Sequence, residues 1–127
     1  MGKLIIQTSE APSAIGTYSQ GVKVNNLVYT SGQIPINPNS GKLIDGDFKS
    51  EVRQVLKNVD AVLKEGGSSL INAVKLTVFL VDLSNFNQVN EVFNEFFSTN
   101  PPARSAVQVS GLPMNSNIEI EGIGYVE

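Results

Sequence analysis

The chain has 127 residues, of which 41% are hydrophobic and 17% charged, and its formal net charge is −3 at neutral pH. This length fits one hydrophobic core, so we expect residues 1–127 to form a single domain. The sequence contains no cysteine and no histidine, which excludes disulfides, thiolate nucleophiles, imidazole-based triads and the usual transition-metal ligands.

The nine basic residues are scattered along the chain and form no continuous positive track. A phosphate backbone needs such a track, so we do not expect nucleic acid to be the main partner. The longest apolar runs, such as residues 76–81, are too short to cross a bilayer, and residues 3–10 do not form a signal-peptide core. We therefore expect no membrane partner and a cytoplasmic location, with a mitochondrial location left open.

The first half of the chain predicts three short strands followed by a helix. Residues 4–7 form the first strand, and alternation on both sides of an Asn-Asn pair predicts a hairpin of residues 21–24 and 27–31. A loop follows at residues 37–41. Apolar residues then recur at three- and four-residue intervals over 48–63, which predicts one buried helix face.

Residues at both ends of this helix support its boundaries. Asp47 can cap its first turn. The pair Gly66 and Gly67 supplies the left-handed residue that commonly ends a helix.

A strand with two apolar faces is predicted next. Residues 73–81 place Val74, Leu76, Val78 and Leu80 on one face and Lys75, Thr77, Phe79 and Val81 on the other. We expect such a strand to be covered on both sides.

A second helix is predicted to begin at Ser84 or Asn85 and to end before a Pro-Pro pair. Its apolar stripe consists of Phe86, Val89, Phe93, Phe96 and Phe97. Two more strands are predicted, near residues 105–109 and 118–126.

The order β-β-β-α-β-α-β-β predicts an α+β fold in which two helices pack on one face of a mixed sheet. The apolar residues on the other face then need cover. A second copy of so short a chain is the simplest cover, so we expect an oligomer.

Five segments carry polar groups that packing alone does not require. They are residues 16–21, 31–35, 86–90, 102–105 and 117–121. In the last of them, the two-residue period of a strand places Glu119 and Glu121 on the same face.

Over nearly its whole length the sequence resembles the RidA (YjgF/YER057c/UK114) family. The most specific pieces are Tyr18-Ser19-Gln20-Gly21, Ser31-Gly32-Gln33-Ile34-Pro35, Pro102-Ala103-Arg104-Ser105 followed by Leu112-Pro113, and Ile118-Glu119-Ile120-Glu121. The resemblance implies a chorismate-mutase-like fold and a homotrimer with inward-facing sheets and clefts between adjacent subunits. It also implies an enzyme, without metal or organic cofactor, that hydrolyses 2-aminoacrylate and 2-iminobutyrate to pyruvate and 2-ketobutyrate with release of ammonia.

Arg104 matches the family arginine that binds the substrate carboxylate. A guanidinium donates parallel hydrogen bonds to a carboxylate, which suits this role. The alternative interpretation is that Arg104 forms a structural ion pair with Glu119 or Glu121.

Glu121 matches the family glutamate that positions or deprotonates the attacking water, which leaves Glu119 without a catalytic role. A partly desolvated carboxylate suits a general base. Without the family, the two glutamates would be interpreted as solvated residues of an edge strand.

Tyr18 matches a family tyrosine that closes the cleft and donates a hydrogen bond. Its alternative interpretation is a structural tyrosine that packs its loop onto the sheet. Ser31 and Asn90 match family positions near the ligand. Their alternative interpretations are a hydroxyl at the end of a strand for Ser31 and an exposed helix residue for Asn90. Gly32 permits close approach of the backbone.

Two positions depart from the family pattern. Ala106 stands where many members carry a cysteine, so no thiol can act there and the pocket can differ in size. Thr17 replaces the proline that often precedes the tyrosine, which can loosen the loop that carries Tyr18.

Two other functions remain open at this point. One is a ribonuclease that inhibits translation, an activity also attached to the family, although the lack of histidine and the negative net charge count against it. The other is a non-catalytic, chaperone-like trimer that binds small carboxylates.

Overall fold

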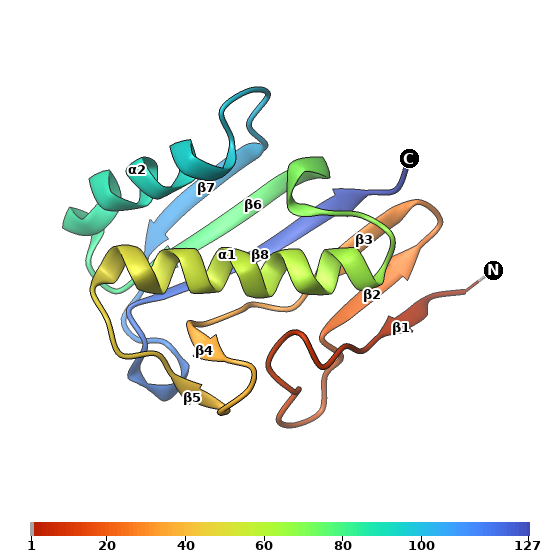
Figure 1. Cartoon of the computed structure of the whole chain (residues 1–127), viewed down its shortest axis with the longest axis horizontal. Helices are drawn as coiled ribbons and strands as arrows, with labels where there is room; N and C mark the ends of the chain where they lie inside the picture. Colours follow the sequence, from red (N-terminus) through yellow and green to blue (C-terminus); the bar gives the residue numbers. More distant parts are fainter. Residues whose placement is uncertain (1) are drawn as a thin grey trace.

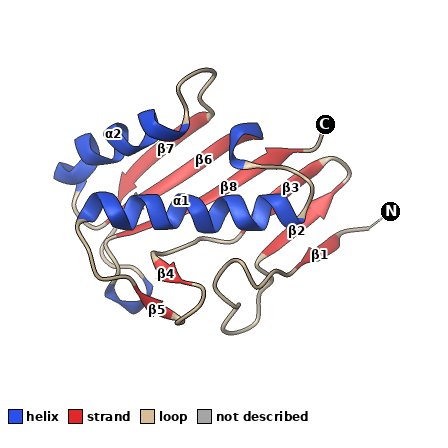
Figure 2. Cartoon of the chain, viewed as in Figure 1, coloured by secondary structure: helices blue, strands red, loops and turns tan. Residues whose placement is uncertain are grey.

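The computed structural model describes residues 2–127. Its main sheet has six strands (Figures 1 and 2). In spatial order these are β1 (Leu4–Ile6), β2 (Gly21–Val24), β3 (Leu27–Thr30), β8 (Ile118–Tyr125), β6 (Ala73–Leu80) and β7 (Ala103–Gln108). Neighbouring strands are antiparallel except for β6 and β7, which are parallel.

Two helices, α1 (Phe48–Glu65) and α2 (Phe86–Phe96), lie on the same face of this sheet (Figure 1). A separate two-stranded ribbon, β4 (Ile36–Asn37) and β5 (Lys42–Leu43), flanks the predicted 37–41 loop. The predicted α+β fold, with two helices on one face of a mixed sheet, is therefore confirmed.

Helix α1 follows its sequence signals closely. The backbone N–H of Ser50 donates to the Asp47 carboxylate at 2.9 Å, as expected of a capping residue. The left-handed residue at the other end is Gly67, with φ 92°, whereas Gly66 is right-handed. The apolar stripe of α1 is buried against the sheet.

Helix α2 starts differently from the prediction. Asn85 occupies the capping position of α2, but its side chain accepts no capping hydrogen bond from the helix backbone. The capping side chain belongs instead to Asp82, which accepts from the Ser84 N–H and opens a short turn of 3-10 helix, η2 (Leu83–Asn85). The helix ends at Phe96, before the Pro-Pro pair.

A β-bulge in β6 overturns one predicted face. The pairing of β6 with β8 shifts register between Ala73 and Lys75. Ala73 therefore takes the buried position, while Val74, predicted to share a face with Leu76, is 41% exposed. Strand β7 also begins at Ala103, ahead of the predicted residue 105, because its parallel pairing with β6 extends that far.

The hydrophobic core lies between the sheet and the helices, where Leu76, Val78 and Ile120 are completely buried. The opposite face of β6 is not covered by any part of residues 2–127. Lys75 and Phe79 on that face are only half-buried.

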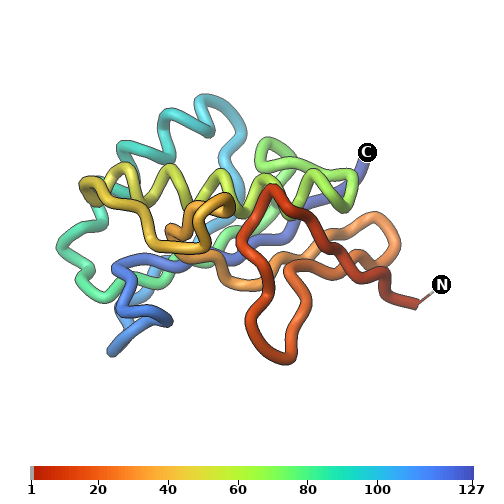
Figure 3. The backbone as a smooth tube through the Cα atoms, turned by 60° about the horizontal axis from the view of Figure 1, so that its bottom comes forward, coloured from red at the N-terminus to blue at the C-terminus, as the bar shows by residue number. Residues whose placement is uncertain are grey.

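The connection between β1 and β2 forms a long loop that stands out from the body of the chain (Figure 3). This loop carries Tyr18. Within residues 2–127, no helix has the length and apolar character needed to span a membrane.

Candidate active-site cleft

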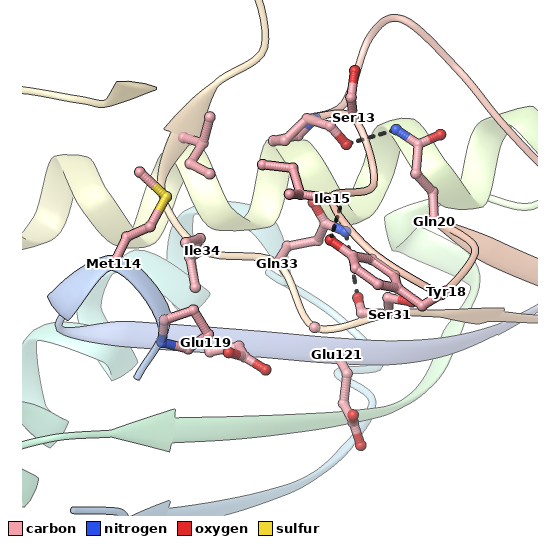
Figure 4. A pocket seen from close by; sticks show the side chains of 14 residues that line it. Ser13, Ile15, Tyr18, Gln20, Ser31, Gln33, Ile34, Met114, Glu119 and Glu121 are labelled. Carbon is pink, nitrogen blue, oxygen red and sulfur yellow. Dashed lines mark hydrogen bonds between the residues drawn. The ribbon is translucent and has the colours of Figure 1, made fainter. Parts of the chain in front are cut away.

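An open cavity of about 650 Å³ lies between the long β1–β2 loop, the segment that follows β3, and strand β8 (Figure 4). Polar groups line part of it and apolar side chains line the rest. Among its lining residues are Ile15, Tyr18, Ser31, Gly32, Ile34, Met114, Glu119 and Glu121. The cavity thus brings together four of the six predicted site residues with Glu119.

The segment that follows β3 continues alongside β8 and brings Gly32 against Glu119. Gln33 and Ile120 exchange two backbone hydrogen bonds, of 2.8 and 3.0 Å, which fix this antiparallel pairing. A Cβ atom added to Gly32 would collide with the Glu119 carboxyl group, whose Cδ lies 2.7 Å from that position. The space left by the glycine is therefore occupied by the Glu119 side chain.

Glu119 and Glu121 lie on the same face of β8, as predicted, but in different surroundings. Glu119 is half-buried, and the pKa of its carboxyl is raised by burial and further raised by the negative charge of Glu121. Glu121 is exposed. Since β8 is paired with β3 and β6, the edge-strand interpretation of these glutamates is wrong.

Tyr18 stands at the mouth of the cavity, 51% exposed, and its hydroxyl oxygen accepts a hydrogen bond from the Ile15 N–H at 3.2 Å. The phenolic proton therefore stays available for another acceptor. Ser31 donates its hydroxyl proton to the Ser19 carbonyl. Toward the cavity, the Ser31 hydroxyl can consequently act only as an acceptor.

Two buried amides hold the cavity walls, and neither was predicted from the sequence to have a role. The Gln20 side chain, 3% exposed, donates to the Pro12 carbonyl at 2.7 Å and accepts from the Thr8 N–H at 2.7 Å. The Asn58 side chain, on α1, donates to the Ile34 and Ile36 carbonyls at 3.1 and 2.9 Å. Asn58 could have been found as a polar residue at helical spacing within an apolar stripe.

Arg104 and Asn90 lie elsewhere. Arg104 pairs with Leu76 across β7 and β6, so its side chain faces the helices and not the Glu119 side of the sheet. Its guanidinium carbon lies 4.9 and 5.0 Å from the ring centroids of Phe86 and Phe93. Asn90 lines the same hollow, of about 500 Å³.

No ion pair is formed by Arg104 within residues 2–127. The predicted alternative of a structural ion pair with Glu119 or Glu121 is therefore wrong for the single chain. Burial lowers the pKa of the Arg104 guanidinium from its ordinary, very high value. In the same part of the chain that the structure describes, no three carboxylates come together in a way that could hold a metal ion.

The family model described as Endoribonuclease L-PSP matches residues 8–126. The chain is 48% identical to the human 2-iminobutanoate/2-iminopropanoate deaminase, over 94% of this chain and 87% of the human protein. The chain belongs to the RidA family. It is also 47% identical to a RutC family protein of Pyrococcus abyssi over the full length of both chains.

RidA family structures share this fold closely. The crystal structure of TdcF from E. coli with bound serine is 42% identical and superimposes with a TM-score of 0.92 over 98% of this chain and 99% of that chain. Names within the family are divided, because one model is named for an endoribonuclease and the human relative for a deaminase. These names alone therefore do not decide between a deaminase and an endoribonuclease.

Proposed function

We propose that this protein is a deaminase that hydrolyses 2-imino acids and their enamine tautomers, such as 2-iminobutyrate and 2-aminoacrylate, to 2-keto acids and ammonia. The observation that carries the proposal is the half-buried Glu119, with its raised pKa, in an open cavity beside Tyr18. A carboxylate with a raised pKa is a better general base than an ordinary one. The human and rat relatives, 48% and 49% identical, are named for this reaction.

The general base in this deaminase is Glu119. The family resemblance favoured Glu121 for this role. Burial and the contact with Gly32 support Glu119, because both restrict its carboxylate to one position at the cavity wall. Glu121 is exposed and contributes the negative charge that helps to raise the pKa of Glu119. Catalysis requires both a fixed position and a suitable pKa.

The substrate-binding arginine comes from a second copy of the chain in this proposal. Among residues 2–127, no lysine or arginine lines the Glu119 cavity and no carboxylate lines the Arg104 hollow. A 2-imino acid needs a cation for its carboxylate and a base for its water. A homotrimer in which Arg104 and Asn90 of one copy complete the cavity of the next would form three such clefts and cover the exposed sheet face.

In this cleft, Arg104 binds the substrate carboxylate through parallel charge-assisted hydrogen bonds. Glu119 accepts a proton from water as the water oxygen bonds to the imine carbon and the C=N electron pair moves to nitrogen. Tyr18 donates a hydrogen bond to the substrate, and Ser31 accepts one from its N–H. Glu119 then returns this proton to nitrogen, which gives the neutral carbinolamine. Transfer of the carbinolamine hydroxyl proton to nitrogen through Glu119 breaks the C–N bond, releases ammonia and leaves the keto acid. Imine hydrolysis is intrinsically fast, so orientation and one base suffice.

The cavity supports a deaminase better than a ribonuclease. In the part of the chain that the structure describes, Glu119 and Glu121 line it without a lysine or arginine, so an RNA phosphate would meet a negative surface there. Even the proposed trimer adds only one arginine to each cleft.

The decisive experiment is subunit complementation. Arg104→Ala and Glu119→Gln should each retain no more than about a tenth of wild-type activity, measured as release of 2-ketobutyrate from 2-iminobutyrate that threonine dehydratase generates, with semicarbazide as competing trap. Dissociating and reassembling the two variants together should restore about one quarter of wild-type activity, because random mixing pairs an intact arginine with an intact glutamate in that share of clefts.

The matched control mixes Arg104→Ala with the double variant Arg104→Ala/Glu119→Gln, which offers no intact arginine. Failure of wild type to accelerate the reaction would reject the deaminase. Activity in wild type without recovery in the mixture would reject the shared cleft and leave the deaminase standing.

A further inference from the structure

Met114 is held in a backbone conformation that its side chain disfavours. It lies in the 3-10 turn η3 (Pro113–Asn115), between β7 and β8, with φ 55° and ψ 24°. Asn115 has φ 57°. Asparagine tolerates this left-handed region, but methionine rarely adopts it. Strain of this kind is commonly found where a side chain has to be placed for function.

The strained turn places the Met114 side chain on the cavity wall. Met114 is 52% exposed, and in Figure 4 it lies beside Ile34 at the end of the cavity away from Tyr18. Ile15 and Ile36 are further apolar residues of the lining. Of the three residues of the turn, Pro113 and Met114 line the cavity and Asn115 does not. Met114 is therefore the flexible side chain that the turn contributes to the cavity.

We propose that Met114 is a specificity-determining residue whose thioether side chain packs against the side chain of the 2-imino acid and favours long apolar substrates. This inference rests on the proposed deaminase function. Methionine suits such a wall because its unbranched, polarisable side chain adapts to ligands of different shape.

The chemistry of the substrate supports this placement. The imine carbon carries three groups: the carboxylate, the nitrogen and the side chain. Arg104 and the pair Tyr18 and Ser31 account for the first two. Ile34 and Met114, at the end of the cavity away from Tyr18, are apolar and are left for the third.

The test compares two imines made in situ by one L-amino-acid oxidase with catalase present, from leucine and from 2-aminobutyrate. In Met114→Gly, the ratio of kcat/KM for the leucine-derived imine to that for 2-iminobutyrate should fall about fivefold, because a half-exposed wall discriminates less than an enclosed pocket. Glycine accepts positive φ without strain, so the turn should persist. Met114→Leu should keep most of the ratio, since it conserves volume.

Asn115→Gly is the matched control, because it relaxes the same turn without changing the cavity lining. It should leave the ratio unchanged. An unchanged ratio in Met114→Gly, or an equal fall in Asn115→Gly, would overturn the role of Met114 while leaving the deaminase intact. If wild type accelerates neither imine, both proposals are rejected together.

Discussion

The Glu119 cavity and the Arg104 hollow lie on opposite sides of the same sheet and are held in different ways. The cavity walls are held by the buried amides of Gln20 and Asn58, which hydrogen-bond to backbone groups. Arg104 is held against the rings of Phe86 and Phe93 and has no ionic partner among the described residues of its own chain. The separation has a consequence for ligands. A base and a cation that cannot neutralise each other within one chain both remain able to bind a substrate.

The largest expected effect is on the base. Glu119→Gln keeps the shape of the side chain and removes proton acceptance, so kcat/KM for 2-iminobutyrate should fall about a hundredfold. Glu121→Gln should have a much smaller effect, because its carboxylate is exposed. The test compares kcat/KM of the two variants by steady-state kinetics. A larger fall in Glu121→Gln than in Glu119→Gln would assign the role of general base to Glu121.

Arg104→Ala should lower kcat/KM about 10- to 100-fold through loss of charge-assisted hydrogen bonds to the substrate carboxylate. Arg104→Lys should fall between this variant and wild type, because it keeps the charge and loses the planar fork. Kinetic constants of both variants, together with their oligomeric state, test this. Equal activity of all three proteins would contradict a carboxylate-binding role.

The buried amide of Asn58 offers a test of how the cavity is held. Asn58→Ala leaves the Ile34 and Ile36 carbonyls without their donor and should cost about 2 kcal/mol of unfolding free energy. Gln54, a half-buried neighbour that donates to Asn58, provides the control, and Gln54→Ala should cost less than about 1 kcal/mol. Urea unfolding at one protein concentration measures both. An equal loss of unfolding free energy in the two variants would show that the hydrogen bonds from Asn58 to the two carbonyls contribute no more than the bond from Gln54.

The smallest expected effect is a shift in the pH dependence of kcat/KM when Glu121 is replaced. A base must be ionised, so kcat/KM should fall as pH drops through the pKa of Glu119, which is raised above its ordinary value. Glu121→Gln removes the neighbouring charge and should move this acidic limb to lower pH, because repulsion then no longer favours the protonated form. Burial is the larger cause, so part of the shift should remain. An unmoved limb would exclude coupling between the two carboxylates.

The sequence alone determined the two long helices and the six strands of the main sheet, because these depend on local periodicity and capping. The α1 stripe and the Asp47 cap were predicted correctly. Pairing between distant strands decided the strand boundaries and the side-chain exposure that the local sequence pattern did not predict. The bulge that exposes Val74 depends on its pairing with β8, and the early start of β7 depends on its pairing with β6.

The same division holds for the candidate site. Strand period alone put Glu119 and Glu121 on one face, but the pairing of the segment after β3 with β8 places Gly32 against Glu119 and leaves Glu121 exposed. The parallel register of β7 against β6 decides that Arg104 faces the helices. A residue's type and its neighbours in sequence determine what chemistry it can do. Contacts between segments far apart in the chain determine its burial, its pKa and its partners, because those depend on what else occupies the surrounding space.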